Sequence, residues 1–93
     1  MDWKDKNIER LLQAFLVLKT ESEVRSFLRD LMTEKEIVEF SKRLRAAEML
    51  NQGQIYTKIE EETGLSSTTV ARVAKCLKGE EGGYKKVLKK LKT

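Results

Sequence analysis

The sequence predicts an all-α protein. Proline is absent from the 93 residues, and Leu, Lys, Glu, Arg and Ala, which favour helices, are abundant. Apolar residues recur every three or four positions, as they do on one face of a helix. The length corresponds to a single domain. We divide it into a helical dimerisation core (1–52), a helix-turn-helix (54–78) and a C-terminal helix (84–92).

Capping residues and glycines mark six helices. Thr20 with Glu23, and Thr33 with Glu36, each form a capping-box sequence that opens a helix. Gly53 stands where it can cap the end of the third helix. The predicted helices are, in chain order, 4–18, 20–31, 33–52, 54–63, 66–78 and 84–92.

Positive charge is concentrated in the C-terminal part of the chain. Residues 1–52 carry ten Lys and Arg against ten Asp and Glu, whereas residues 53–93 carry nine against five. A basic half beside a neutral half indicates a surface that faces a polyanion such as double-stranded DNA. The alternative is that these lysines serve solubility.

Composition argues against several other classes of protein. The chain has no histidine and one cysteine, Cys76, so zinc sites and catalytic thiols with a histidine base are not expected. Because Cys76 cannot form an internal disulfide, we expect a cytoplasmic protein. No apolar run approaches the roughly 18–20 residues that span a membrane. We therefore predict no enzyme activity, no metal site and no membrane association.

The N-terminal helices carry more apolar surface than a small core requires. The first helix ends in "FLVL" (15–18), and the third has Val38 and Met49 outside its main apolar stripe. Burial against a second copy would cover this surface. We predict a homodimer; the alternative is a monomer whose helices wrap one another.

The segment that begins at Tyr56 fits a helix-turn-helix, in which a tight turn fixes the angle between a supporting and a recognition helix. With Tyr56 as the first position, the turn glycine is expected ninth, where Gly64 stands. Two positions depart from the pattern, because Glu60 occupies the fifth, usually small, and Thr63 the eighth, often apolar. Apolar residues are expected at the fourth, tenth, fifteenth and eighteenth positions, which are Ile59, Leu65, Val70 and Val73.

Four hydroxyl residues in "SSTT" (66–69) open the recognition helix. Ser66 or Ser67 can cap it, and the amides of its first turn suit a phosphate. Ser67 and Thr68 would face base edges, and Ala71 leaves room for a thymine methyl group. Capping explains one hydroxyl but not all four. The predicted DNA-binding residues are Lys58, Ser66, Ser67, Thr68, Thr69, Ala71, Arg72 and Lys75.

The stretches "FLRDLMTEKEIVEFSKRLRAAEMLNQGQ" (27–54) and "IEEETGLSSTTVARVAKCLK" (59–78) resemble the Trp repressor family, most closely its Trp repressor-like branch. The resemblance runs from about Phe27 to Leu91. It implies a six-helix fold with a helix-turn-helix, and an intertwined homodimer. Such dimers bind half-sites one helical turn apart, roughly 34 Å.

The resemblance also implies an effector pocket, formed here by Thr33, Arg43 and Arg72, because the two arginines match those that sandwich tryptophan in the repressor. Val73 stands where the repressor has a glycine that makes room for this corepressor, so we do not expect tryptophan to bind. An overpacked site typically costs 1–3 kcal/mol. In simpler interpretations Arg72 faces a phosphate, and Arg43 pairs with Glu39 or Glu36 on its own helix.

Three functions remain open. The leading hypothesis is a dimeric, sequence-specific DNA-binding transcriptional regulator with a pseudo-palindromic operator. The second is a repressor gated by a small-molecule effector. The third is a protein-interaction adaptor that keeps the helix-turn-helix shape, for which the acidic run Glu60–Glu62 is the supporting feature.

Overall fold

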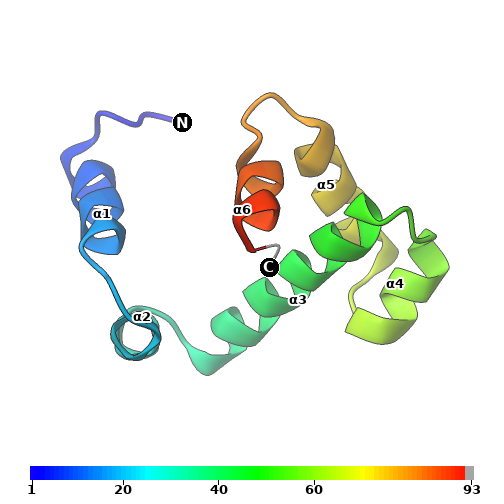
Figure 1. Cartoon of the computed structure of the whole chain (residues 1–93), viewed down its shortest axis with the longest axis horizontal. Coiled ribbons are helices and arrows are strands. Elements are labelled where there is room, and N and C mark those ends of the chain that lie inside the picture. Colours follow the sequence, from blue (N-terminus) through cyan, green and yellow to red (C-terminus); the bar gives the residue numbers. More distant parts are fainter. Residues whose placement is uncertain (92–93) are drawn as a thin grey trace. The chain divides into compact units, whose positions relative to one another are not determined.

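The computed structural model describes residues 1–91 and contains six α-helices (Figure 1). All helix ends lie within two residues of the predicted boundaries, and the described part of the chain contains no strand, which confirms the all-α class. The predicted last helix ends at Lys92, which lies outside the described residues. The helices are α1 (Lys6–Leu16), α2 (Glu21–Leu31), α3 (Glu34–Asn51), α4 (Tyr56–Thr63), α5 (Ser67–Lys78) and α6 (Gly83–Leu91).

The chain divides into two compact units, Met1–Glu34 and Lys35–Thr93. The first unit contains α1 and α2. Asp5 caps α1 by accepting hydrogen bonds from the backbone N–H groups of Asn7 (2.9 Å) and Ile8 (3.1 Å). The capping box predicted at Thr20 is confirmed at the start of α2, where Thr20 and Glu23 bond reciprocally.

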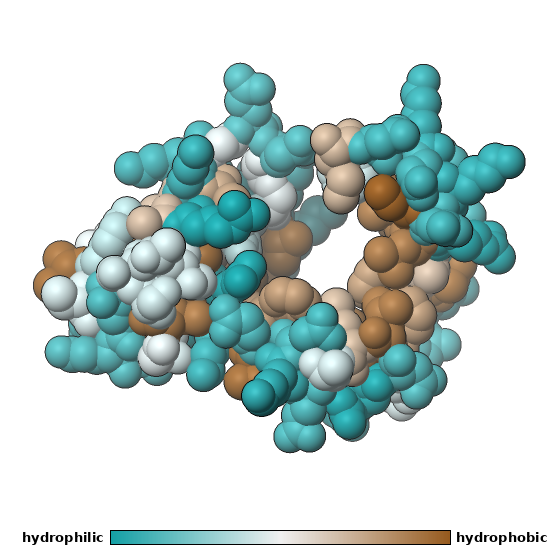
Figure 2. All heavy atoms as spheres, turned by 180° about the vertical axis from the view of Figure 1, so that it is seen from behind, coloured by the Kyte–Doolittle hydropathy of each residue, from teal (hydrophilic) through white to brown (hydrophobic). Residues whose placement is uncertain are grey.

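Apolar contacts in the first unit are sparse. The rings of Phe15 and Phe27 meet edge to face, with their centroids 5.3 Å apart, and this contact joins α1 to α2. None of the described residues of this unit is buried. Figure 2 shows apolar side chains, in brown, uncovered on its surface. The unit therefore has amphipathic helices without a closed core of its own.

The second unit holds the core of the protein. The C-terminal half of α3 packs with α4, α5 and α6, and the fully buried side chains include Met49, Ile59 and Val70. Ala46 and Ala47, both 0% exposed, allow the neighbouring helices to approach α3 closely. This core fixes the geometry of α4 and α5.

A glycine in the left-handed conformation ends α3 before the short connection to α4. Gly53 has φ +83°, and the chain there forms a Schellman motif, since Gln54 N–H donates to the Met49 carbonyl (3.0 Å) and Gly53 N–H to that of Leu50 (3.0 Å). An ion pair between Arg45 of α3 and Glu62 of α4, 3.7 Å long, adds a polar link.

No helix among residues 1–91 is long and apolar enough to cross a membrane.

Candidate nucleic-acid interface

The turn between α4 and α5 is built around Gly64. Its φ of +74° lies in the left-handed region, and its N–H donates to the Glu60 carbonyl at 2.8 Å. A side chain would be strained at this φ, whereas glycine is not. The turn allows α5 to leave α4 at a sharp angle after two further residues.

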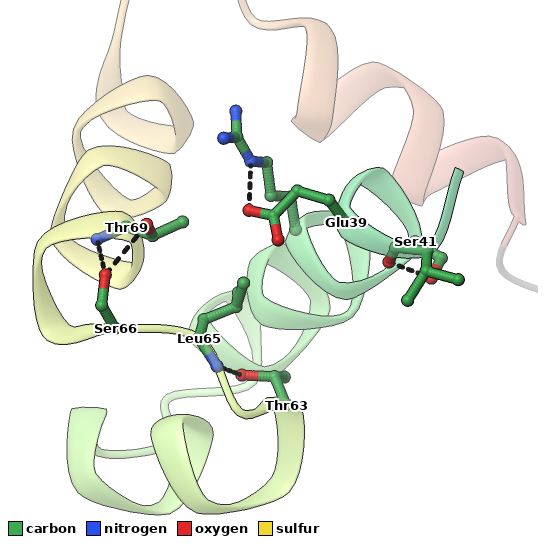
Figure 3. Close-up of polar contacts among 8 residues, drawn as sticks. Glu39, Ser41, Thr63, Leu65, Ser66 and Thr69 are labelled. Carbon is green, nitrogen blue, oxygen red and sulfur yellow. Dashed lines mark hydrogen bonds and ion pairs between the residues drawn. The ribbon is translucent and has the colours of Figure 1, made fainter. Parts of the chain in front are cut away.

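Thr63 is the buried polar group of this turn (Figure 3). It is 6% exposed, and its hydroxyl donates to the Ile59 carbonyl at 2.7 Å and accepts from Leu65 N–H at 3.2 Å. A buried polar group is tolerated when its hydrogen bonds are satisfied. The departure from an apolar eighth position is therefore compensated, a role that the sequence analysis did not identify.

The four predicted apolar positions of the helix-turn-helix all belong to the core. They hold the supporting and recognition helices together, and none is more than 7% exposed: Ile59, Leu65, Val70 and Val73.

The acidic residues of α4 do not form one free patch. Glu60 is half-buried, Glu61 is exposed, and Glu62 pairs with Arg45. Lys58 is exposed on the same helix and forms no ion pair within residues 1–91.

Ser66 is the residue that caps α5. Its hydroxyl oxygen accepts from Thr69 N–H at 3.2 Å and also bonds the Thr69 hydroxyl at 3.0 Å (Figure 3). These contacts occupy two of the four hydroxyls. Ser67 and Thr68 are exposed, and their hydroxyls make no hydrogen bond with the described part of the chain, so these hydroxyls are available to a ligand.

The outer face of α5 carries the remaining residues that were predicted to bind DNA. Its inner face consists of Val70, Val73, Ala74 and Leu77, which are buried. Residues three and four positions apart share a face of a helix. The exposed face that results contains Thr68, Ala71, Arg72 and Lys75.

The three residues predicted to form an effector pocket do not all belong to the same unit. Thr33 belongs to the first unit, whereas Arg43 and Arg72 belong to the second. Arg43 pairs with Glu39 on its own helix at 3.3 Å, as in the simpler interpretation, and its guanidinium carbon lies 5.7 Å from the ring centre of Phe40.

The charges of both arginines act on the phenol of Tyr84, an effect that the sequence analysis did not identify. Burial raises the pKa of this phenol above its ordinary value, and Cys76 raises it further, whereas the positive charges of Arg43 and Arg72 lower it. No local motif marks this electrostatic effect, because the residues come from α3, α5 and α6. Among residues 1–91, no group of three or more acidic or cysteine side chains could hold a metal ion.

The family model of the Trp repressor protein matches residues 6–92. The chain belongs to the Trp repressor family. This is a family of transcriptional regulators, which accords with the absence of a catalytic constellation in the sequence.

Several relatives align with nearly the whole of this chain, and two of them are solved structures with a similar fold. The YerC protein of Bacillus subtilis is 38% identical over 89 residues, which cover 96% of this chain and 86% of YerC. A TrpR-like protein from Eubacterium eligens is 38% identical, with a TM-score of 0.88 over 96% of this chain and 92% of that one. A proposed Trp repressor from Staphylococcus aureus is 33% identical, with a TM-score of 0.89 over 98% and 94% of the two chains.

Proposed function

We propose that this chain is a homodimeric, cytoplasmic transcriptional regulator that binds a pseudo-palindromic DNA operator through α5. The observation that carries the proposal is the outer face of α5, where Thr68, Ala71, Arg72 and Lys75 are exposed on a helix whose other face is packed. A recognition helix needs this combination, because its angle must be fixed while its base-contacting side chains remain free.

Different residues serve specificity and affinity in this proposal. Ser67 and Thr68 contact base edges near the start of α5, and Ala71 accepts a thymine methyl group. Lys58, Arg72 and Lys75 contact phosphates, which gives affinity without sequence information. Ser66 and Thr69 act indirectly, since their mutual contacts fix the first turn of α5.

The charge of the C-terminal part of the chain supports a nucleic-acid partner. Thr63 to Thr93 contain eight Lys and Arg against two Asp and Glu. Cations on α5 form no ion pair within residues 1–91, so they remain available for phosphates. Neutralisation of phosphates releases counterions, and we therefore expect affinity to fall steeply with salt.

A selection of bound duplexes from a randomised pool tests the proposal. The full chain is used at near-physiological salt with no added effector. An enriched pseudo-palindrome with half-sites about 10 base pairs apart is expected. Failure to enrich any sequence contradicts ligand-free operator binding.

Two outcomes would favour the other functions. Enrichment only after a metabolite extract is added would indicate an effector-gated repressor. Duplex binding no tighter than that of an unrelated basic protein, in both conditions, would indicate the adaptor. The pairing of Glu62 with Arg45 weakens the case for the adaptor, since it engages part of the acidic run that such an adaptor would present.

A further inference from the structure

A lysine of α3 reaches the turn of the helix-turn-helix. The ammonium nitrogen of Lys42 lies 4.0 Å from the position that a Cβ at Gly64 would occupy. Apart from the two residues that flank Gly64, no other atom among residues 1–91 comes within 4 Å of that position, so the space on this side of the turn is open. Lys42 therefore places a positive charge in open space beside the turn that leads into α5.

This lysine differs from the neighbouring Arg45 in having no acidic partner. The two residues are three positions apart and share a face of α3. Arg45 pairs with Glu62 of α4 at 3.7 Å, whereas Lys42 forms no ion pair within residues 1–91. Lys42 is half-buried, and a lysine can cover its apolar stem while its charged head stays in water. Its charge is thus left uncompensated by the chain.

The end of α4 offers a cation a structural role, which the contacts of Lys42 do not support. Carbonyl groups at the end of a helix carry partial negative charge that a nearby cation can stabilise. The ammonium of Lys42 donates no hydrogen bond to the described part of the chain, and the Glu60 carbonyl already accepts one from Gly64 N–H at 2.8 Å. The donors of Lys42 are therefore free for a partner outside the chain.

The position of this charge suits the phosphate backbone of DNA. Ser66, the cap of α5, follows Gly64 by two residues, so their Cα atoms are at most about 7.6 Å apart, twice the spacing of consecutive Cα atoms. Double-stranded DNA carries one negative charge per roughly 1.7 Å of its axis. A duplex that meets Ser67 and Thr68 at the start of α5 therefore also brings phosphates close to the turn.

We propose that Lys42 is a further DNA-contacting residue: its ammonium binds a backbone phosphate beside the turn at Gly64, so that the DNA-binding surface includes α3 as well as the helix-turn-helix. This inference rests on the proposed function, because it adds a contact to the same DNA complex. The contact gives affinity without sequence information, since phosphates are common to all duplexes.

The experiment measures the affinity of the full chain for its selected operator and for an unrelated duplex at several salt concentrations. We expect Lys42→Gln to weaken binding to both duplexes by about fivefold. The slope of log affinity against log salt should fall by about one, because one phosphate fewer is neutralised. Lys42→Arg, which keeps the charge, should retain the slope of wild type.

Lys86→Gln is the matched control. Lys86 also lies beside a glycine with a left-handed φ, with its Cε 3.9 Å from the Cβ position of Gly82, but this glycine precedes α6. The variant makes the same change of charge away from the helix-turn-helix. We expect it to bind both duplexes with the slope of wild type.

A DNA-free measurement separates the phosphate contact from an effect on stability. Thermal unfolding followed by circular dichroism should give Lys42→Gln the Tm of wild type, because the ammonium bonds no group of the described chain. If Lys42→Gln is poorly folded, Lys42→Met, which keeps an unbranched apolar stem, takes its place in the binding experiment.

An unchanged slope for the variant without charge, whether or not its affinity falls, would overturn the inference, since the number of neutralised phosphates would be the same. Specific operator binding by wild type would remain intact in that case. Absence of any preferred sequence for wild type would instead refute the proposed function, and the contact of Lys42 with operator DNA would fall with it.

Discussion

Thr63 shows how a single polar side chain can stabilise a buried turn. Its hydroxyl bridges the Ile59 carbonyl and Leu65 N–H inside the helix-turn-helix. We expect Thr63→Val, which has nearly the same shape, to lower the free energy of unfolding by roughly 1–3 kcal/mol, because it leaves the Leu65 N–H unpaired in a buried site. Urea denaturation followed by circular dichroism measures the change. Thr57→Val, at an exposed position of the same helix, should change stability by less than about 0.5 kcal/mol. Equal stability of the two variants would contradict this role for Thr63.

Gly64 makes a conformational rather than a chemical contribution. Since its φ is +74°, Gly64→Ala places a Cβ in the left-handed region, at a cost of roughly 1–2 kcal/mol. Gly83→Ala is the matched control, because Gly83 has no left-handed φ and no atom within 4 Å of the added Cβ. We expect the control to be neutral or slightly stabilising in the same denaturation measurement. Destabilisation of both variants by the same amount would show that the left-handed turn is not the cause.

At the scale of single residues, the contacts that could be predicted from the sequence were the local ones. The caps at Thr20 and Ser66 and the left-handed Gly64 follow from short motifs, in which the interacting groups lie within four residues. The packing of Tyr84 against the core could not be derived in this way, because it depends on how α6 lies against the other helices of the second unit. For Thr63, the sequence pattern expected an apolar side chain and did not reveal that its hydroxyl would find two partners.

At the scale of the element, we expect α5 to contact base edges through some residues and phosphates through others. We expect Thr68→Ala to lose discrimination at one or two base pairs by roughly 1–3 kcal/mol per position. In contrast, Lys75→Gln should weaken binding to all duplexes alike and reduce the slope of log affinity against log salt by about one. Titrations of operator and single-mismatch duplexes at several salt concentrations measure both effects. Lys86→Gln, on α6, makes the same change of charge outside the proposed surface and should leave the salt slope unchanged. Exchange of these two behaviours between Thr68 and Lys75 would refute the proposed orientation of α5.

The helices themselves were predictable because their signals are strong and local. The absence of proline, the apolar periodicity and the glycines at helix ends together predicted all six helices, including the short α4. The exposed face of α5 followed from the same periodicity, since the buried positions Val70, Val73 and Leu77 determine which side remains open. What each exposed side chain binds is a different question, because exposure makes a residue available without naming its partner.

At the scale of the whole molecule, the two units differ in how well they bury their apolar residues. The second unit has a closed core, whereas the described residues of Met1–Glu34 include none that is buried. Segments below about 40 residues seldom form a stable core without further support. Leu16 and Val17 are 82% and 69% exposed, and large apolar patches of this kind mark interaction sites. The excess apolar surface that the sequence predicts is therefore exposed at the end of α1.

A second copy of the chain is the occupant that we expect. It would bury the apolar side of α1 and α2 and set two α5 helices at the fixed spacing that a pseudo-palindrome requires. Leu16→Glu should then convert a dimer to a monomer at micromolar concentration and lower operator affinity, because it places a charge in the buried interface. Gln13→Glu adds the same charge to the polar side of α1 and should leave the dimer intact. Light scattering after size-exclusion chromatography gives the mass of each species. A monomeric wild type, or a Leu16→Glu variant that remains dimeric, would show that the exposed residues of α1 do not form the contact between copies.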